Sequence, residues 1–547
     1  MKNCQELSNI LTAKYVAAGR VKKIPELKLH ISHVEPEGFT SKYAAGVLTI
    51  DSAGAYGHAC GIAQMTAATK AGHLADYLGK TTPKFPLRLV WLDTESEVEI
   101  ADLVTIHLPF FMLNPDLMSW VPQTAQRLIE LGYNAILLGC RKSIFVPNVV
   151  SQKVDLQSVI KMFGLYGIKV ILKPNLQFLQ DDHCSKCPLD EAFRASLTKA
   201  LSQLHALVPA CNSIMWESML QSPRFRFHQQ AKDLTLVDIV IQEVQLVEKC
   251  HQLQGKKGER ELIFYLPLSS ISEGRSHAEW IPTLLDEMGE KTTFAFSSVQ
   301  GNFCHDHLPD HPLWQQLRQS PDCSATPLLP IVNLGAVEQG EGLWPATNFD
   351  LIERFYPRLR RHTFAGVIGV VNHLPEEGSF LDGLLWVAGQ SLWRDMPPSM
   401  LAETWFSAYR EEKDFAHMLL ALKAVRKIVL EFSLLRSLEN NEERRRIGEP
   451  LAMQLKEPTY FFDKKEWVMK RPSMKDYFNL FVCDTKRFLE QSLQLSCRAA
   501  FGSSFGHEEP QSSFWTHPKG RGDFLVKPQE GFPGSVMEAI YKENRFL

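Results

Sequence analysis

The stretch Leu128-Ile-Glu-Leu-Gly-Tyr-Asn-Ala-Ile-Leu-Leu138 runs from a helical pattern, through a glycine, into a short apolar segment. Glycine just beyond the last helical turn commonly ends a helix, because it adopts the left-handed backbone conformation without steric penalty. A short apolar run after such a stop is typical of a strand buried on both faces. The stretch therefore predicts a helix, a tight connection and a buried strand.

The same kind of apolar run recurs along the middle of the chain. We expect strands at Leu87–Leu92, Ala135–Leu138, Val170–Leu172, Ile214–Trp216, Leu262–Leu266, Thr293–Phe296, Leu328–Val332 and Val367–Val371. Helical patterns lie between most of these runs, at Thr124–Leu131, Leu156–Phe163, Glu191–Leu207, Leu236–Leu253, Ala278–Met288 and Phe349–Leu359. An open doubly wound sheet gives the same local alternation, but a count of eight favours closure. The sequence therefore predicts an α/β fold with a (β/α)8 TIM barrel over residues 85–398.

A small α/β accessory domain is expected in front of the barrel, over residues 1–84. Leu27–Ser32 and Val47–Asp51 are short, rich in β-formers and flanked by turn residues, which predicts two strands. The alanine-rich stretch Cys60–Tyr77 predicts a helix. Gly54-Ala-Tyr-Gly57 before it lacks the spacing of a nucleotide-binding glycine loop, so no nucleotide cofactor is expected.

Two regions are expected behind the barrel. Residues 399–498 are helical in pattern, with long amphipathic stretches at Asp414–Arg436 and Lys475–Leu495. These stretches leave open whether the chain forms a homodimer or packs them on its own barrel. Residues 499–547 are rich in Gly, Pro, Ser and His, which predicts an irregular tail.

Composition limits the classes of partner. Hydrophobic residues make up 45% and charged residues 22% of the chain, as in ordinary globular proteins. A formal net charge of -3 gives no field suited to nucleic acid. No run approaches the roughly 20 apolar residues of a membrane span, and the 11 scattered cysteines favour reduced thiols. We expect a cytoplasmic protein with neither nucleic-acid nor membrane partners.

In barrels of this kind, active sites lie where the strands end at their carboxyl termini. The residues at those ends include several carboxylates, aromatic rings and cations, a set suited to cleaving a glycosidic bond. The catalytic candidates are Glu217, Glu338, Glu341 and Asp306. The substrate-binding candidates are Asp93, Glu95, Arg141, Lys173, Trp216, His305, Trp344 and Asn372.

Glu217 is the sharpest of these candidates. It ends an apolar strand, and an apolar wall would raise its pKa, as a general acid requires. The alternative is a carboxylate that pairs with Arg224 or Arg226 on the next loop. Glu338 and Glu341 follow the seventh strand in a Gly-rich loop and are expected to act as base, nucleophile or hydroxyl ligand, unless that loop is simply solvated.

The remaining candidates also have two interpretations. Asp93 and Glu95 would hold sugar hydroxyls or cap the next helix. Arg141 and Lys173 would bind a substrate carboxylate or form an ion pair inside the barrel mouth. The aromatic rings would stack on sugars.

A metal site is not expected. Cys304-His-Asp-His307 with Asp310-His311, and His183-Cys184 with Cys187, each lack a second half with metal-ligand spacing. His305 or Asp306 would assist catalysis without a metal. A metal-dependent hydrolase is kept as a third hypothesis.

Two segments resemble known glycosidases. Gly366-Val-Ile-Gly-Val-Val-Asn-His373, with Leu381–Trp393 and Met400–Trp405, resembles the closing strand and following helices of microbial α-glucuronidases. Val47–Asp51 with Gly54–Gly57, and then Phe85-Pro-Leu-Arg88, look like the accessory domain and barrel entry of α-glucuronidases and β-hexosaminidases.

The resemblance implies a carboxylate pair acting on a glycoside, with Glu217 as the general acid and Glu338 or Glu341 contributing the base. The chain departs from the hexosaminidase pattern, because Trp216 stands where that family has Asp before the acidic residue. The leading hypothesis is a glycoside hydrolase acting on an oligosaccharide or glycoconjugate, with an acidic or an N-acetylated sugar as alternatives. The second hypothesis is a catalytically silent barrel that binds carbohydrate or a protein.

Overall fold

The structure is a computed structural model of the whole chain. It describes residues 8–13, 15–16, 26–31, 37–94, 96–140, 148–150, 154–176, 187–219, 234–252, 260–266, 281–288, 292–297, 326–335, 352–353, 356–357, 359, 364–371, 374–375, 377–378 and 380–409. The predicted helical region beyond Tyr409 and the predicted tail lie outside these residues.

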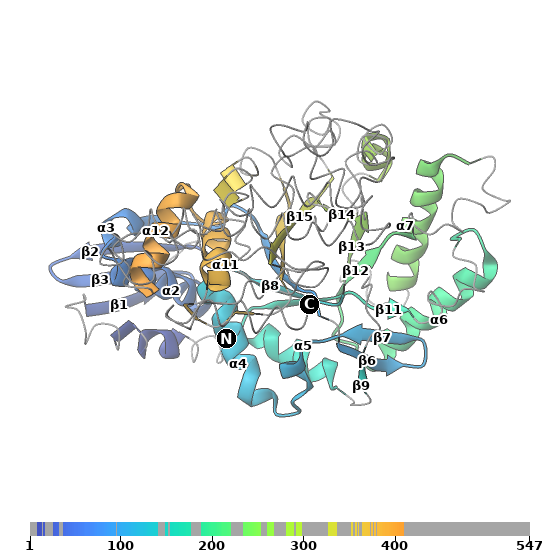
Figure 1. Cartoon of the computed structure of the whole chain (residues 1–547), viewed down its shortest axis with the longest axis horizontal. Coiled ribbons are helices and arrows are strands. Elements are labelled where there is room, and N and C mark those ends of the chain that lie inside the picture. Colours follow the sequence, from blue (N-terminus) through green and yellow to red (C-terminus); the bar gives the residue numbers. More distant parts are fainter. Residues whose placement is uncertain are drawn as a thin grey trace, which may run out of the picture.

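The centre of the molecule is a closed barrel of eight parallel strands (Figure 1). In chain order the strands are β5 (Leu87–Leu92), β8 (Ala135–Leu138), β10 (Lys169–Leu172), β12 (Ser213–Glu217), β13 (Glu261–Leu266), β14 (Thr293–Ser297), β15 (Leu328–Gly335) and β16 (Gly366–Val371). Each pairs with the next along the chain, and β16 closes the ring by pairing with β5. The predicted barrel is confirmed, and all eight predicted strands are found.

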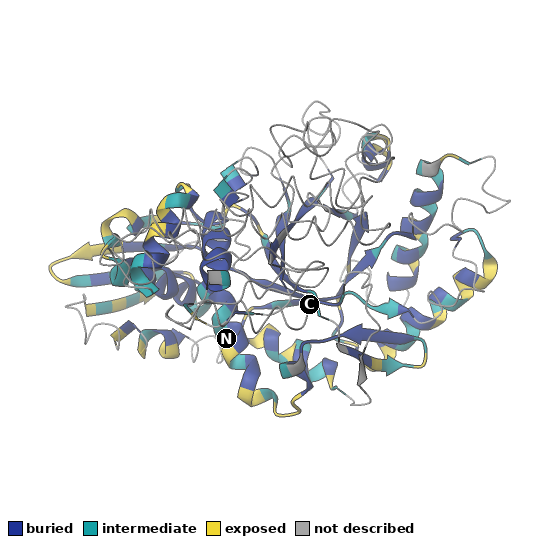
Figure 2. Ribbon diagram, viewed as in Figure 1, coloured by how far each residue is buried: buried dark blue, intermediate teal, exposed yellow. Residues whose placement is uncertain are grey.

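Burial explains why these segments form the barrel. Alternate residues face its interior, where apolar side chains such as Leu89, Leu137, Ile171 and Met215 form a closed inner core. The intervening residues face the surrounding helices and join the larger outer core. Both faces of the strands are therefore buried, as Figure 2 shows in dark blue around the barrel.

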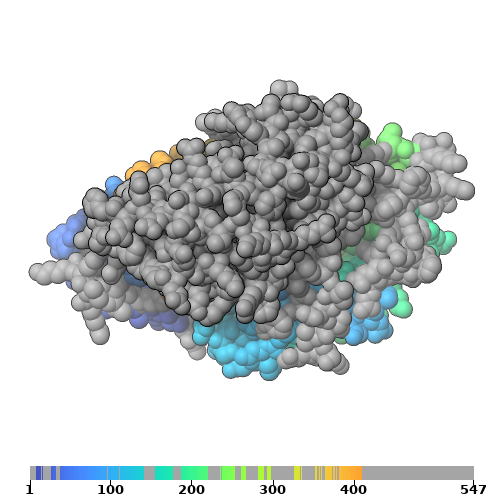
Figure 3. All heavy atoms as spheres, viewed as in Figure 1, coloured from blue at the N-terminus to red at the C-terminus, as the bar shows by residue number. Residues whose placement is uncertain are grey.

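Helices cover the outside of the barrel. They are α4 (Leu117–Leu131), α5 (Leu156–Leu165), α6 (Glu191–Leu207), α7 (Leu236–Gln252), residues 281–288 and α11 (Phe380–Ser391). The helix α12 (Pro398–Tyr409) follows α11 and lies beside the N-terminal unit (Figure 1). The side chain of Asp116 caps α4, and Gly132 ends it in the left-handed conformation predicted for this glycine. In the space-filling view α4 lies at the molecular surface, coloured light blue (Figure 3), and its Met118 is exposed.

The N-terminal unit is a sheet covered by helices. Its strands β1 (Glu26–Ile31), β2 (Phe39–Ala44), β3 (Val47–Ser52) and β4 (Gly79–Thr81) pair in the order β1-β3-β2-β4. Two of these strands, β2 and β4, were not predicted. The single helix predicted at Cys60–Tyr77 is instead two, α2 (Ala55–Ala71) and α3 (Leu74–Tyr77), because Gly72 adopts a φ of 81° and ends the first.

Four short strands form a further sheet that the sequence did not predict. They are β6 (Ser96–Ala101), β7 (Val104–His107), β9 (Asn148–Val150) and β11 (Asn175–Leu176), in the order β11-β7-β6-β9. The hairpin of β6 and β7 follows β5, and β11 follows β10, so this sheet grows from the connections at the carboxyl ends of the barrel strands.

The last described helices join the N-terminal unit to the barrel. α12 packs against α2 and α11, and α11 packs against α4. The division into domains at residues 84, 398 and 498 stays a prediction. The contact of α12 with α2 joins a helix that precedes the barrel in the sequence to one that follows its last strand.

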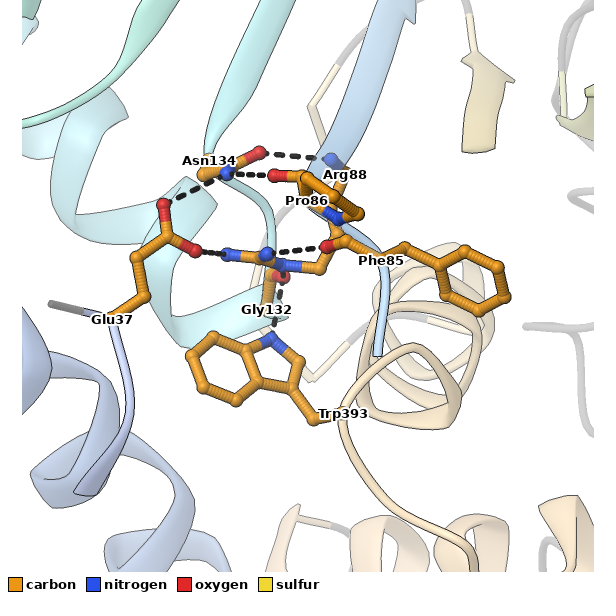
Figure 4. A network of polar contacts seen from close by, with 7 residues as sticks. All are labelled: Glu37, Phe85, Pro86, Arg88, Gly132, Asn134 and Trp393. Atoms are coloured by element: carbon orange, nitrogen blue, oxygen red, sulfur yellow. Dashed lines mark hydrogen bonds and ion pairs between the residues drawn. The ribbon is translucent and has the colours of Figure 1, made fainter. Parts of the chain in front are cut away.

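A polar network at the amino end of β5 makes the same connection (Figure 4). The buried Arg88 pairs with Glu37 of the N-terminal unit at 2.7 Å, and its guanidinium also donates to the carbonyls of Gly132 and Phe85. Asn134 donates to the second oxygen of Glu37 at 3.0 Å. The guanidinium lies 4.6 Å from the ring of Trp393, which follows α11.

Candidate active site at the barrel mouth

The alternation of side chains identifies which residues face the barrel mouth. Trp91, Ile171 and Met215 point into the barrel, so the residues two positions later, Asp93, Lys173 and Glu217, follow on the same face. The backbone ladder continues to these positions: Asp93 donates to Val371, and Lys173 donates to Leu138, both at 2.8 Å. Three predicted site residues therefore belong to the inner face at the carboxyl end of the barrel.

Lys173 and Glu217 are brought together there. The ammonium of Lys173 lies 2.8 Å from Oε2 of Glu217, and it donates a hydrogen bond to the carbonyl of Cys140 at 2.8 Å. Their side chains are 11% and 23% exposed, so the pair is largely but not completely removed from solvent. Of the two interpretations given for Lys173, the structure shows the ion pair. The partner of Glu217 is Lys173; Arg224 and Arg226 lie outside the described residues.

The surroundings of Glu217 differ from the apolar wall expected for it. A cation within hydrogen-bonding distance stabilises the ionised form of a carboxylate. Lys173 gives Glu217 a cationic partner inside the mouth.

An aromatic layer lies beneath this pair. Trp91 is fully buried and meets Tyr265 edge to face, with ring centroids 5.9 Å apart. The indole of Trp91 donates to the carbonyl of Gly139 at 2.8 Å, and the ammonium of Lys173 lies 6.0 Å from its ring. Trp91 thus packs beneath the Lys173 side chain, and because it is buried it offers no exposed ring face for stacking on a sugar.

Gly139 makes room for the lysine. Its φ is 150°, and a Cβ at this position would lie 2.6 Å from Cβ of Lys173 and 2.7 Å from the Lys173 carbonyl oxygen. A side chain here would displace Lys173 from Glu217. The glycine is therefore a steric requirement of the pair.

Trp216 needs a correction. It neighbours Glu217 along β12 and so faces the opposite side of the strand, where it is buried and its indole donates to Oε1 of Glu243 on α7 at 2.8 Å. A tryptophan in this position does not line the mouth, and the predicted sugar-binding role does not fit it. The reason is the two-residue period of a strand, which sends adjacent side chains to opposite faces.

A second polar group lies on the sheet of β6, β7 and β11. Glu97 is buried, and Thr105 and Asn175 both donate to its Oε1, Asn175 at 2.9 Å. Asn175 stands two residues after Lys173, so the contact links the hairpin after β5 to the segment after β10. This contact was not predicted, because Glu97 is one of several polar residues in the segment that follows the first barrel strand.

The other predicted site residues lie outside the described part of the chain, and their roles stay predictions. They are Glu338, Glu341, Asp306, Glu95, Arg141, His305, Trp344 and Asn372. Among the residues that the structure does describe, no group of three His, Cys, Asp or Glu is arranged to hold a metal ion. Within the same residues, no helix is both long and apolar enough to cross a membrane.

Comparisons with known proteins give a likeness in fold alone. No protein-family model matches the chain, and no curated protein matches it. Similar solved structures include a β-N-acetylglucosaminidase from Vibrio harveyi (11% identity, TM-score 0.43, covering 77% of this chain and 73% of that one). Another is an N-acetyl-β-hexosaminidase from Streptomyces plicatus (11% identity, TM-score 0.42, covering 72% and 88%). What those enzymes act on is a property of those enzymes, and the resemblance to α-glucuronidases stays a prediction.

Proposed function

We propose that the barrel mouth binds a carbohydrate and that Glu217 provides carboxylate chemistry for hydrolysis of a glycosidic bond. One observation carries this proposal. Glu217 is a partly exposed carboxylate on the inner face at the carboxyl end of β12, and Lys173 holds it at 2.8 Å. In a (β/α)8 barrel this end is where catalytic groups lie.

The ion pair suggests a division of roles. Glycoside hydrolysis needs one carboxylate that is ionised and one acid that carries a proton. Lys173 suits Glu217 to the ionised role, in which it stabilises the developing positive charge, attacks the sugar or activates a water. The protonated acid is then sought among the predicted residues Asp306, Glu338 and Glu341, which takes the acid role away from Glu217.

Lys173 also bears on the substrate. Its ammonium has three protons to donate, and the structure shows it bonded to Cys140 and Glu217. A carboxylate or carbonyl on a sugar would find a donor here, which supports an acidic or N-acetylated substrate.

The second candidate is a barrel that binds carbohydrate without cleaving it. The same ion pair favours it, because Glu217 already has a partner and a paired carboxylate can be purely structural.

The test is turnover of a panel of aryl glycosides, including uronides and N-acetylhexosaminides, by the full-length protein. Glu217→Gln removes the charge with little change of shape and is expected to lower kcat by about 10²- to 10⁴-fold. Glu248→Gln on α7 is the matched control, since Glu248 bonds only to Gln252 within its own helix in the described contacts. Equal turnover by wild type and Glu217→Gln would refute the catalytic role. Equal glycan affinity with no turnover by either would favour binding alone.

A further inference from the structure

One buried carboxylate stands directly behind the segment that carries Glu217. Glu243 lies on α7 with its side chain fully buried. Its Oε1 accepts hydrogen bonds from the indole of Trp216 at 2.8 Å and from the backbone amide of Met219 at 2.9 Å. Its Oε2 accepts one from the hydroxyl of Ser218 at 2.9 Å.

The three donors flank Glu217 on both sides. Trp216 precedes it, while Ser218 and Met219 follow it. The amide of Ser218 in turn donates to the carbonyl of Tyr265 on the neighbouring strand, at 2.8 Å. The backbone around Glu217 is thus held from the helix side by Glu243 and from the strand side by β13. Movement of this segment would break several bonds to a buried group.

Burial of Glu243 is costly, and among the described residues the hydrogen bonds that offset the cost come from this segment. Desolvation raises the pKa of Glu243 to about 7, although the hydrogen bonds from Trp216, Met219 and Ser218 act to lower it. None of the ion pairs in the described part of the chain involves Glu243. The described hydrogen bonds of Glu243 thus all connect it to the end of β12 and the two residues that follow.

We propose that Glu243 is a positioning residue, which fixes the end of β12 so that Glu217 faces the mouth against Lys173. This inference rests on the proposed function, because that function is what makes the position of Glu217 important. It adds a residue of α7 to the site.

Substitutions of Glu243 differ in whether they keep an acceptor for the three donors. In Glu243→Gln the amide oxygen still accepts from Trp216 and Met219. The amide nitrogen can donate to the Ser218 hydroxyl, which then acts as acceptor instead of donor. Glu243→Leu keeps much of the volume but removes the acceptor that the three donors share. Glu248→Leu makes the same chemical change on the same helix, away from β12.

The experiment has two readouts on the full-length protein. The first is kcat and KM on whichever glycoside the wild type turns over. A displaced catalytic group loses rate rather than binding, and misplacement by about 1 Å can cost roughly 100-fold. Glu243→Leu is therefore expected to lower kcat at least about tenfold with a smaller change in KM, and Glu243→Gln to stay within about threefold of wild type.

The second readout needs no substrate. A water-soluble carbodiimide with an amine labels carboxyl groups, and peptide mass spectrometry gives the rate at Glu217. Glu243→Leu is expected to raise that rate several-fold, while Glu243→Gln and Glu248→Leu leave it unchanged and the exposed Asp238 labels equally in all. If the wild type cleaves no glycoside, the proposed function fails, and this readout alone decides the positioning role.

Some results would overturn the inference. A Glu243→Leu protein that melts like the wild type and labels Glu217 at the wild-type rate would do so, whatever its turnover. Should Glu243→Leu fail to fold, Trp216→Phe and Ser218→Ala each remove one donor, and both must raise Glu217 labelling for the inference to stand.

Discussion

The two ends of the barrel hold the same chemical arrangement, a cation paired with a carboxylate beside a tryptophan ring. At the amino end, Arg88 pairs with Glu37 at 2.7 Å and lies 4.6 Å from Trp393. At the mouth, Lys173 pairs with Glu217 at 2.8 Å and lies 6.0 Å from Trp91. The two distances within the ion pairs hardly differ.

What differs is how completely each cation is bound. The side chain of Arg88 is 0% exposed, and its guanidinium also donates to two backbone carbonyls. Lys173 is 11% exposed and donates to one carbonyl. The two carboxylates do not show this difference, since Glu37 is 32% and Glu217 is 23% exposed. A fully bound cation contributes to stability, while a partly exposed pair keeps groups available to a ligand. The burial of the cation and the number of its bound donors, rather than the ion pair itself or the exposure of the carboxylate, therefore separate the structural pair from the candidate site.

The largest effect is expected from Arg88→Met. Removing the fully buried guanidinium takes one donor each from Oε2 of Glu37, the carbonyl of Gly132 and the carbonyl of Phe85. It should lower the free energy of unfolding by about 3 kcal/mol. Urea unfolding followed by circular dichroism measures this. Arg88→Lys keeps the charge but loses the planar set of guanidinium donors, so its free energy of unfolding should lie between those of the wild type and Arg88→Met. A loss below about 1 kcal/mol would show that the amino-end network is not structural in this sense.

A second effect concerns another buried polar pair near the amino end of the barrel strands. His251 Nε2 lies 3.1 Å from the carbonyl of Glu261, the first residue of β13, so that nitrogen carries the proton and Nδ1 accepts from Nε2 of His205 at 3.0 Å. Burial, with the charge of Arg260, lowers the pKa of His205 to about 3 and of His251 to about 4. Both imidazoles are therefore neutral in the folded chain at pH 5.

The consequence for stability follows from proton uptake. Between pH 6.5 and about pH 4 the unfolded chain binds more protons at these two positions, so stability falls as pH falls. Between pH 7.5 and pH 5.0, each imidazole is expected to lower the free energy of unfolding by about 2 kcal/mol. His251→Gln should reduce this pH-dependent loss of stability by the contribution of one imidazole. His30→Gln, at an exposed residue, should leave the loss unchanged. Urea unfolding at both pH values measures the difference.

The wild-type total alone would not decide this prediction. The raised pKa of Glu243 has the opposite sign, because the folded chain then binds the extra proton as pH falls below 7 and gains stability. Only the difference between the wild type and His251→Gln isolates the histidine. If that difference is the same at pH 7.5 and 5.0, the pair does not stay neutral as expected.

The barrel could be predicted from sequence because its strands are buried on both faces. Leu87–Leu92 and Ala135–Leu138 have the bounds that their apolar runs indicate. β6 was missed although Glu97-Val-Glu-Ile100 alternates polar and apolar residues, because it begins only four residues after the end of β5 and so lies within the connection expected there. Gly72 was missed as a helix end because the alanine-rich pattern continues beyond it.

The site was only partly predictable. The positions of Asp93, Lys173 and Glu217 follow from where strands end, and the same two-residue period would have turned Trp216 outward. Glu243 had no such signal: it stands in an amphipathic helix, where one Glu among many looks solvated, and only the packing of α7 on β12 brings it to Trp216. The strands that carry Lys173 and Glu217 are neighbours in the predicted barrel, but the sequence left open whether Lys173 forms an ion pair there or binds a substrate carboxylate.

The smallest effect, and the sharpest test of the comparison, is expected from Lys173→Met. Lys173 keeps some contact with water and makes two polar contacts, whereas Arg88 is 0% exposed and makes three. Lys173→Met should therefore lower the free energy of unfolding by about 1 kcal/mol, against about 3 kcal/mol for Arg88→Met. Lys173→Arg is the control for charge, since it keeps a cation but cannot reproduce the compact ammonium contact. Urea unfolding of the three variants under one set of conditions gives the ranking. A loss from Lys173→Met as large as that from Arg88→Met would make the mouth pair a structural one, and the carboxylate of Glu217 would then no longer stand out as a group kept available for a ligand.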